Sequence, residues 1–144
     1  MRFMVLMIPE RTKYEQGAMP EEAMIAAMMK YNEELVNAGI LLAGDGLHPH
    51  ARGARVSFAG GKPTVVDGPY LEAREMIGGY WMWQVKSKEE AVAWATRCPA
   101  NEGDILELRQ VFDPEDFGPE VAAKEAALME QIGQQMAENA KQGR

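Results

Sequence analysis

The sequence predicts an α+β domain in which two helices pack on one face of an antiparallel sheet. Residues 2–8 and 76–85 are short runs that are apolar on both alternating faces, which is typical of central strands covered on both sides. Two segments with helix signals, residues 20–38 and 88–97, each follow one of these runs. At 144 residues the chain is long enough to bury a core without disulfides.

The first strand and the first helix are separated by a polar segment. Pro9 ends the strand, and residues 10–18 are expected to form a loop. The helix begins at Pro20-Glu21-Glu22, because proline fits a first turn and acids favour the positive end of the helix dipole. It ends at Gly39. Its helical spacing predicts a stripe that packs into the core, made of Met24, Met28, Tyr31 and Leu35.

The middle of the chain predicts a hairpin. Residues 40–53 are expected to form a short strand that runs into an irregular loop. Residues 54–58 and 63–66 form two strands, because the glycines at 60–61 reach the positive φ that a tight turn needs. Asp67-Gly68-Pro69 ends the second strand, and residues 71–75 connect it to the strand at 76–85. In that strand, Gly78-Gly79 indicates a bulge or a close backbone approach.

The last third predicts a helix, a strand and a second, longer helix. Ser87 and Glu90 have the spacing of a capping box before a helix over residues 88–97. Residues 105–112 alternate and predict the last strand. The tail from 119 to 140 has an apolar face at helical spacing, made of Val121, Leu128, Met129, Ile132 and Met136.

The order of these elements, with the hairpin set aside, is the β-α-β-β-α-β order of the ferredoxin-like fold. Two helices cover only one face of such a sheet, yet both central strands are apolar on both faces. A second copy of the chain is the simplest cover for the other face, so we expect a twofold homodimer. The tail helix folding back over that face is the alternative.

Composition excludes several classes of partner. The net charge is −7, which argues against nucleic acid and an anionic membrane surface. The single cysteine, Cys98, allows no internal disulfide and reads as a small buried side chain. The apolar run before Pro9 is too short for a signal peptide, and no run is long enough to span a bilayer. We expect a cytoplasmic protein.

Several segments resemble the DGPF-domain branch of the YCII-related family. They are Asp67-Gly68-Pro69-Tyr70 with Gly78-Gly79-Tyr80, Tyr31-Asn32-Glu33-Glu34-Leu35, Gly46-Leu47-His48-Pro49, and Leu108-Arg109-Gln110-Val111-Phe112. The family motif has phenylalanine where this chain has Tyr70. The resemblance covers residues 1–118, which we take as the domain, and leaves residues 119–144 as a C-terminal helical extension.

The resemblance implies a ferredoxin-like fold assembled as a dimeric α/β barrel. It also implies acid–base catalysis by a His–Asp pair in some members, and a regulatory role in others that are encoded beside alternative sigma factors. The histidine of that pair would stand eleven residues before Gly39, where this chain has Met28. This departure weakens the expectation of an enzyme.

The only histidines, His48 and His50, flank Pro49 in the predicted loop. His48 is a candidate general base because its ordinary pKa lies near neutrality, and Asp67 is a candidate partner. A solvated loop histidine and an aspartate that holds its own turn are the structural alternatives. Asp45 with both histidines matches no metal motif, so we expect no metal.

Ligand contacts are predicted for aromatic and charged residues around the two later strands. Arg74 can bind an anionic group, and Trp81 and Trp83 can line an apolar pocket, although packing in the core or at a dimer interface is the simpler use of both tryptophans. Glu107 and Arg109 share one face of the last strand and can pair or anchor a ligand. Tyr70 completes the set.

We therefore expect a homodimeric small-molecule-binding or accessory domain, with no nucleotide cofactor because no phosphate loop is present. One alternative is an enzyme that uses His48 and Asp67 for acid–base chemistry on a small substrate. Another is a protein-interaction partner of a transcription system based on a sigma factor.

Overall fold

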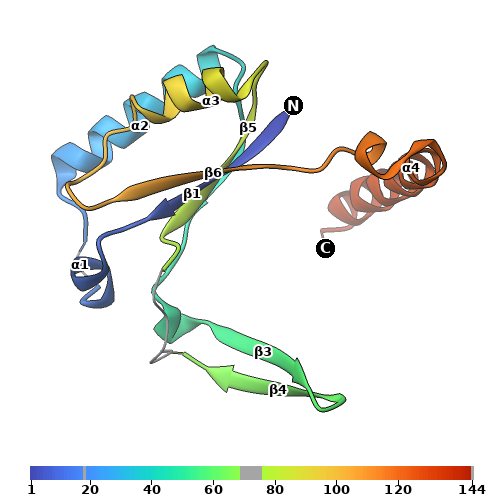
Figure 1. Ribbon diagram of the computed structural model, residues 1–144, viewed down its shortest axis with the longest axis horizontal. Coiled ribbons are helices and arrows are strands. Elements are labelled where there is room, and N and C mark those ends of the chain that lie inside the picture. Colours follow the sequence, from blue (N-terminus) through green and yellow to red (C-terminus); the bar gives the residue numbers. More distant parts are fainter. Residues whose placement is uncertain (18, 69–75, 144) are drawn as a thin grey trace. The chain divides into compact units, whose positions relative to one another are not determined.

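The computed structural model describes residues 1–17, 19–68 and 76–143. The chain divides into two compact units, residues 1–110 and 111–144. The first unit has the predicted β-α-β-β-α-β order with an inserted hairpin, and the second holds the C-terminal helix (Figure 1). None of the helices in the described part of the chain combines the length and the apolar character that crossing a membrane requires.

The main sheet has four strands in the order β2-β5-β1-β6. These are β1 (Arg2–Ile8), β2 (Leu41–Gly46), β5 (Gly79–Gln84) and β6 (Ile105–Gln110), and every neighbouring pair is antiparallel. The two segments that are apolar on both faces, β1 and β5, occupy the centre as predicted. The last strand ends two residues earlier than expected, at Gln110.

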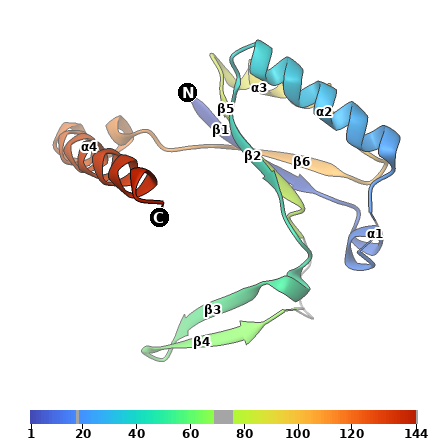
Figure 2. The ribbon, with the colours of Figure 1, turned by 180° about the vertical axis from the view of Figure 1, so that it is seen from behind.

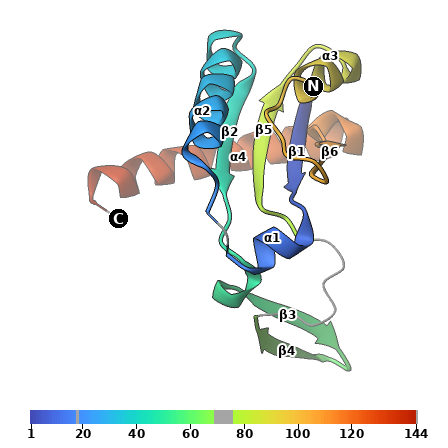
Figure 3. The same cartoon turned by 90° about the vertical axis from the view of Figure 1, so that its left-hand side faces the viewer.

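Two helices lie on one face of this sheet (Figure 2). α2 (Glu22–Asn37) contacts β2, and α3 (Lys88–Ala95) contacts β6, so the pair spans the sheet from edge to edge (Figure 3). Gly39 follows the end of α2 with a φ of 71°, the left-handed conformation in which a glycine ends a helix, so the predicted end of this helix is confirmed. The Ser87 side chain caps α3 by accepting from the Glu90 amide, while the Glu90 carboxylate accepts from the Lys86 amide instead of completing a capping box.

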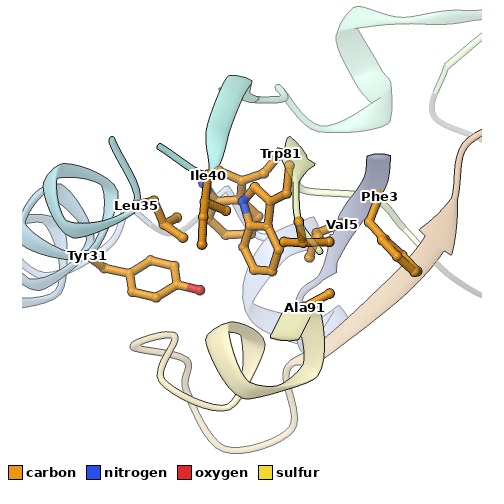
Figure 4. Packing of buried hydrophobic residues seen from close by; sticks show 9 residues of the cluster. Phe3, Val5, Tyr31, Leu35, Ile40, Trp81 and Ala91 are labelled. Carbon is orange, nitrogen blue, oxygen red and sulfur yellow. The ribbon is translucent and has the colours of Figure 1, made fainter. Parts of the chain in front are cut away.

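The core lies between the sheet and these helices (Figure 4). Alternate residues of β1 and β5, namely Phe3, Val5, Trp81 and Trp83, meet side chains from the helices and their flanks, namely Tyr31, Leu35, Ile40 and Ala91. Met28 packs against this cluster, so the position of the missing family histidine is filled by a core side chain. The Tyr31 hydroxyl donates to the Trp94 carbonyl at 2.8 Å, and burial raises its pKa.

One local prediction was wrong, and another is decided between its two alternatives. The expected loop at 10–18 contains a one-turn helix, α1 (Arg11–Glu15), stabilised by the Glu10 carboxylate that accepts from the Thr12 amide. At Gly78-Gly79 the second of the two predicted alternatives is found, a close backbone approach, because a Cβ at Gly79 would lie 3.0 Å from the Asp45 carbonyl. The irregular register of the sheet lies in β2, between Leu41 and Ala43.

The hairpin consists of β3 (Ala54–Ala59) and β4 (Lys62–Asp67), each longer than predicted. Gly60 and Gly61 form the turn with φ values of 63° and 79°, which a side chain would oppose. Between β2 and the hairpin, η1 (His50–Arg52) forms one 3₁₀ turn.

Candidate functional site

The face of the main sheet opposite α2 and α3 is here called the open face. Because side chains alternate along a strand, the buried residues Val5 and Trp81 identify the covered face, and their sequence neighbours point the other way. The centre of the open face is therefore apolar and consists of half-buried Met4, Leu6, Ile8 and Met82.

Polar residues stand at both edges of the open face. Asp45 on β2 is paired with Tyr80 on β5, Tyr80 with Leu6 on β1, and Leu6 with Glu107 on β6. Directly paired residues point to the same side of a sheet, so these four residues form one line across it, here called the edge row. With strands about 4.8 Å apart, Tyr80 and Glu107 are separated by roughly 10 Å of apolar surface.

The two ends of the edge row are each engaged in a polar contact. The Tyr80 hydroxyl donates to the Asp45 carboxylate at 3.1 Å. On the opposite edge, Arg109 donates to the Glu107 carboxylate at 3.2 Å. Arg109 stands one row away from Glu107, on the same face, where it is paired with Met4. The predicted residues Glu107 and Arg109 thus lie on the same face as Tyr80 and Asp45, a pair that could not be identified from the sequence.

The Tyr80–Asp45 contact has a measurable consequence. Its hydrogen bond and the carboxylate charge raise the pKa of Tyr80, because ionisation would place two negative charges together. A raised tyrosine pKa adds stability below the ordinary value near 10 and loses it as the pH rises through the folded-state value. We expect Asp45→Asn to lower the Tyr80 pKa, measured by ¹³C-tyrosine NMR titration. A Tyr80 pKa that does not change would show that Asp45 exerts no such effect.

His48 and Asp67 lie on different elements. His48 precedes η1, and its Nε2 lies 3.0 Å from the Arg52 Nη1. A guanidinium only donates, so the His48 nitrogen must accept in this contact. Asp67 is exposed at the end of β4, where it is paired with Ala54. No hydrogen bond or ion pair among the described residues joins His48 to Asp67, and Tyr70 and Arg74 fall outside the described residues.

Trp81 and Trp83 point to the covered face and belong to the core. Their rings lie 6.3 Å apart, and the Trp81 indole N–H donates to Asn32 at 2.9 Å. Both side chains therefore pack against the helices on the face opposite the open face.

A scan against family models matches residues 1–117 to the YCII-related domain. This chain belongs to the YCII-related family. This chain is similar to the solved structure of a 5-chloro-2-hydroxyhydroquinone dehydrochlorinase from Burkholderia phenoliruptrix AC1100, in complex with 2,5-dihydroxybenzoquinone. The identity is 15%, the match covers 78% of this chain and 96% of the other, and the TM-score is 0.42. No curated protein matches this chain significantly.

In this YCII-related chain, the loop that precedes β3 is hydrogen-bonded to the residue that follows β4. The Gly68 amide donates to the Gly53 carbonyl at 2.9 Å, and a Cβ at Gly68 would lie 1.6 Å from the His50 carbonyl oxygen. The glycine of Asp67-Gly68-Pro69 is therefore required by contact with a second segment.

Gly68→Ala should separate these segments and reduce the free energy of unfolding by about 1–3 kcal/mol, because a backbone hydrogen bond is lost or strained. Gly46→Ala is the matched control, since a Cβ there would meet nothing within 4 Å. Urea denaturation of both variants tests this. Equal stabilities would contradict it.

The single cysteine lies beyond α3. Burial, followed by the nearby Asp104 carboxylate, raises the pKa of the Cys98 thiol to about 11 from its ordinary 9.0. The thiolate fraction at pH 8 is then about 100-fold lower than in the unfolded chain, so reaction with iodoacetamide should be slower by about that factor. Equal rates in native and urea-unfolded protein would contradict this.

No cluster of three metal-binding side chains occurs among the described residues.

Proposed function

We propose that this chain is a small-molecule-binding domain that acts as a homodimer, with the ligand held on the open face of the sheet. The observation that supports this is the edge row, which places a Tyr–Asp pair and a Glu–Arg pair on either side of an apolar strip. An apolar surface with few convergent polar groups is the usual character of a ligand site.

The proposed site favours a small molecule with both apolar surface and hydrogen-bonding groups. The Asp45 and Glu107 carboxylates accept hydrogen bonds, so they suit hydroxyl or amino groups of a ligand. Arg109 has further donors beyond the one directed at Glu107, and these suit an anionic oxygen. Met4, Leu6 and Met82 supply the surface on which a flat, partly apolar molecule would lie.

The same face of the sheet supports the proposed homodimer. In a single copy the polar pairs are open to water, where ion pairs contribute little. A second open face, related by a twofold axis, would cover Met4, Leu6 and Met82 and exclude water from the edge row. This arrangement corresponds to the dimeric α/β barrel expected from the resemblance. We also assign the chain to the DGPF branch, on its Asp67-Gly68-Pro69 and Gly78-Gly79-Tyr80 segments.

The enzyme alternative uses His48 and Asp67, with Tyr70 and Arg74 as ligand residues. In this alternative the loop around η1 supplies the base, and the ligand extends from the open face toward it. It requires a substrate, or a change in the loop, to bring His48 away from Arg52. The test is whether an activity found for the chain disappears in His48→Gln.

A second candidate function is protein interaction through the second unit. In that unit, η2 (Pro114–Phe117) leads into α4 (Pro119–Lys141), and the rings of Phe112 and Phe117 are 5.0 Å apart. α4 exposes its whole apolar stripe, namely Val121, Leu128, Met129, Ile132 and Met136. Exposed apolar surface of this kind marks interaction sites. Ile132→Glu should abolish binding to such a partner and leave ligand binding unchanged.

A ligand-detected NMR screen of small aromatic acids, phenols and amines tests the proposed function. We expect hits that are weakened at least tenfold in Tyr80→Phe and in Glu107→Gln, and that persist in Thr64→Ala, which changes an exposed residue of β4 outside the edge row. Hits that bind both open-face variants as tightly as the original chain would refute the location. The absence of any hit would favour the interaction function.

A further inference from the structure

The β3–β4 hairpin has one apolar face, here called the hairpin strip. Val56 is paired with Val65 and Phe58 with Pro63, so all four side chains point to the same side. Their fractional exposures are high: 51% for Val56, 83% for Phe58 and 65% for Val65. The other face carries Arg55, Ser57, Lys62 and Thr64, together with Ala59 and Val66. The hairpin strip is therefore the more apolar of the two faces, and Asp67, paired with Ala54 at one end, adds the one charge on its side.

A hairpin of this kind is not stable by its own contacts. Two strands without a packed face are marginal in water, and every residue from 54 to 67 is exposed. Phenylalanine and valine on such an exposed pair promote pairing with another chain. The hairpin strip therefore needs a cover.

The charge of this segment differs in sign from that of the whole chain. Residues 50–67 contain three basic side chains, Arg52, Arg55 and Lys62, and one acidic side chain, Asp67, so their net charge is +2. The chain as a whole carries −7. The segment is thus attracted to the remainder of another copy, which is strongly acidic.

The loop that leads to the hairpin begins beside the open face. β2 carries Asp45 of the edge row and ends at Gly46. The Leu47 amide then donates to the Gly78 carbonyl at 2.8 Å, and the Tyr14 hydroxyl donates to the Leu47 carbonyl at 3.1 Å. These bonds attach the start of that loop to the end of the sheet, at the rim of the proposed dimer interface.

We infer that the hairpin strip packs against the second copy of the chain, so that each protomer extends one hairpin onto its partner. This inference rests on the proposed homodimer and extends it by naming the segment that adds contact area beyond the sheets. Phe58, the most exposed aromatic side chain of the strip, is the central contact.

Sedimentation equilibrium of the full chain tests this with two matched variants. The double change Phe58→Ser with Val65→Thr polarises the hairpin strip, and Ser57→Ala with Thr64→Ala changes its other face. We expect the first to raise the dimer dissociation constant at least about tenfold, since both hairpins of the dimer are affected, and the second to change it less than about twofold. If the original chain is a dimer and both variants have the same dimer dissociation constant as the original chain, the inference is overturned. The homodimer proposal would then be retained.

A photo-crosslinking measurement tests the contact without depending on a destabilising change. p-Benzoylphenylalanine at position 58, in dimers mixed from ¹⁵N-labelled and unlabelled chains, should give products that join the two chains. Products confined to one chain, or joined only to another protein, would overturn the inference. A chain that sediments as a monomer at all concentrations would refute the homodimer proposal itself, and this inference with it.

Discussion

Replacing Trp83 by alanine should lower the free energy of unfolding by about 3–5 kcal/mol, the usual cost of removing a large buried aromatic side chain. Trp83 is 0% exposed and lies in the core cluster between the sheet and the helices. It is one of the largest fully buried side chains of the described residues, so the cavity left behind would be large. Urea denaturation followed by circular dichroism measures the loss.

Replacing the two core tryptophans by phenylalanine, one at a time, should lower the free energy of unfolding by different amounts. The buried Trp83 indole N–H has no hydrogen-bond partner among the described residues, so Trp83→Phe removes an unsatisfied donor together with some volume. Trp81→Phe instead deprives Asn32 of the N–H that it accepts at 2.9 Å. We expect Trp81→Phe to destabilise more than Trp83→Phe. The reverse order would show that the packing volume of Trp83 outweighs its unsatisfied donor.

Met82→Lys should convert the proposed dimer into a monomer. Met82 is at the centre of the open face, and a lysine there would be buried without a partner when two open faces meet. We expect the dimer dissociation constant to rise by at least about 100-fold, because the change occurs twice in a symmetric interface.

The fold of the single copy should survive this change, since Met82 is only half-buried there. Met29→Lys is the matched control, because Met29 is an exposed methionine of α2 on the covered side of the sheet. Sedimentation equilibrium at several loading concentrations measures both constants. Dimers of unchanged affinity in Met82→Lys would place the interface elsewhere.

The sequence was sufficient for the arrangement of the main sheet. Apolar residues on both faces of 2–8 and 76–85 are typical of central strands, and the structure places β1 and β5 at the centre of the sheet. The helix boundaries followed from local signals, such as the positive φ at Gly39 and the Ser87 cap. Helix capping and the conformation of a terminal glycine depend on residues within a few positions of each other, so a sequence pattern can predict them.

The candidate site was less accessible to sequence reasoning. Asp45 and Tyr80 are 35 positions apart, and their contact depends on the register of β2 against β5 after an irregularity at Leu41–Ala43. Glu107 and Arg109 were recognised as a polar pair because they are two positions apart on one strand. Their alignment with Tyr80 depends on the β1–β6 register, which alternation alone does not determine. α1 was missed because it is a single turn, and beside the local bond at Glu10 it is also held by a contact with distant backbone, the bond from Tyr14 to Leu47.

The methionine methyl groups offer the most direct test that the open face is the functional face. ¹³C-methyl NMR of the full chain, recorded over a dilution series and then with a bound screening hit, observes Met4 and Met82 on the open face and Met28 and Met29 on α2. We predict that Met4 and Met82 shift in both experiments and that Met28 and Met29 do not. Shifts confined to Met129 and Met136 of α4, with Met4 and Met82 unchanged, would contradict the account and move the function to the second unit.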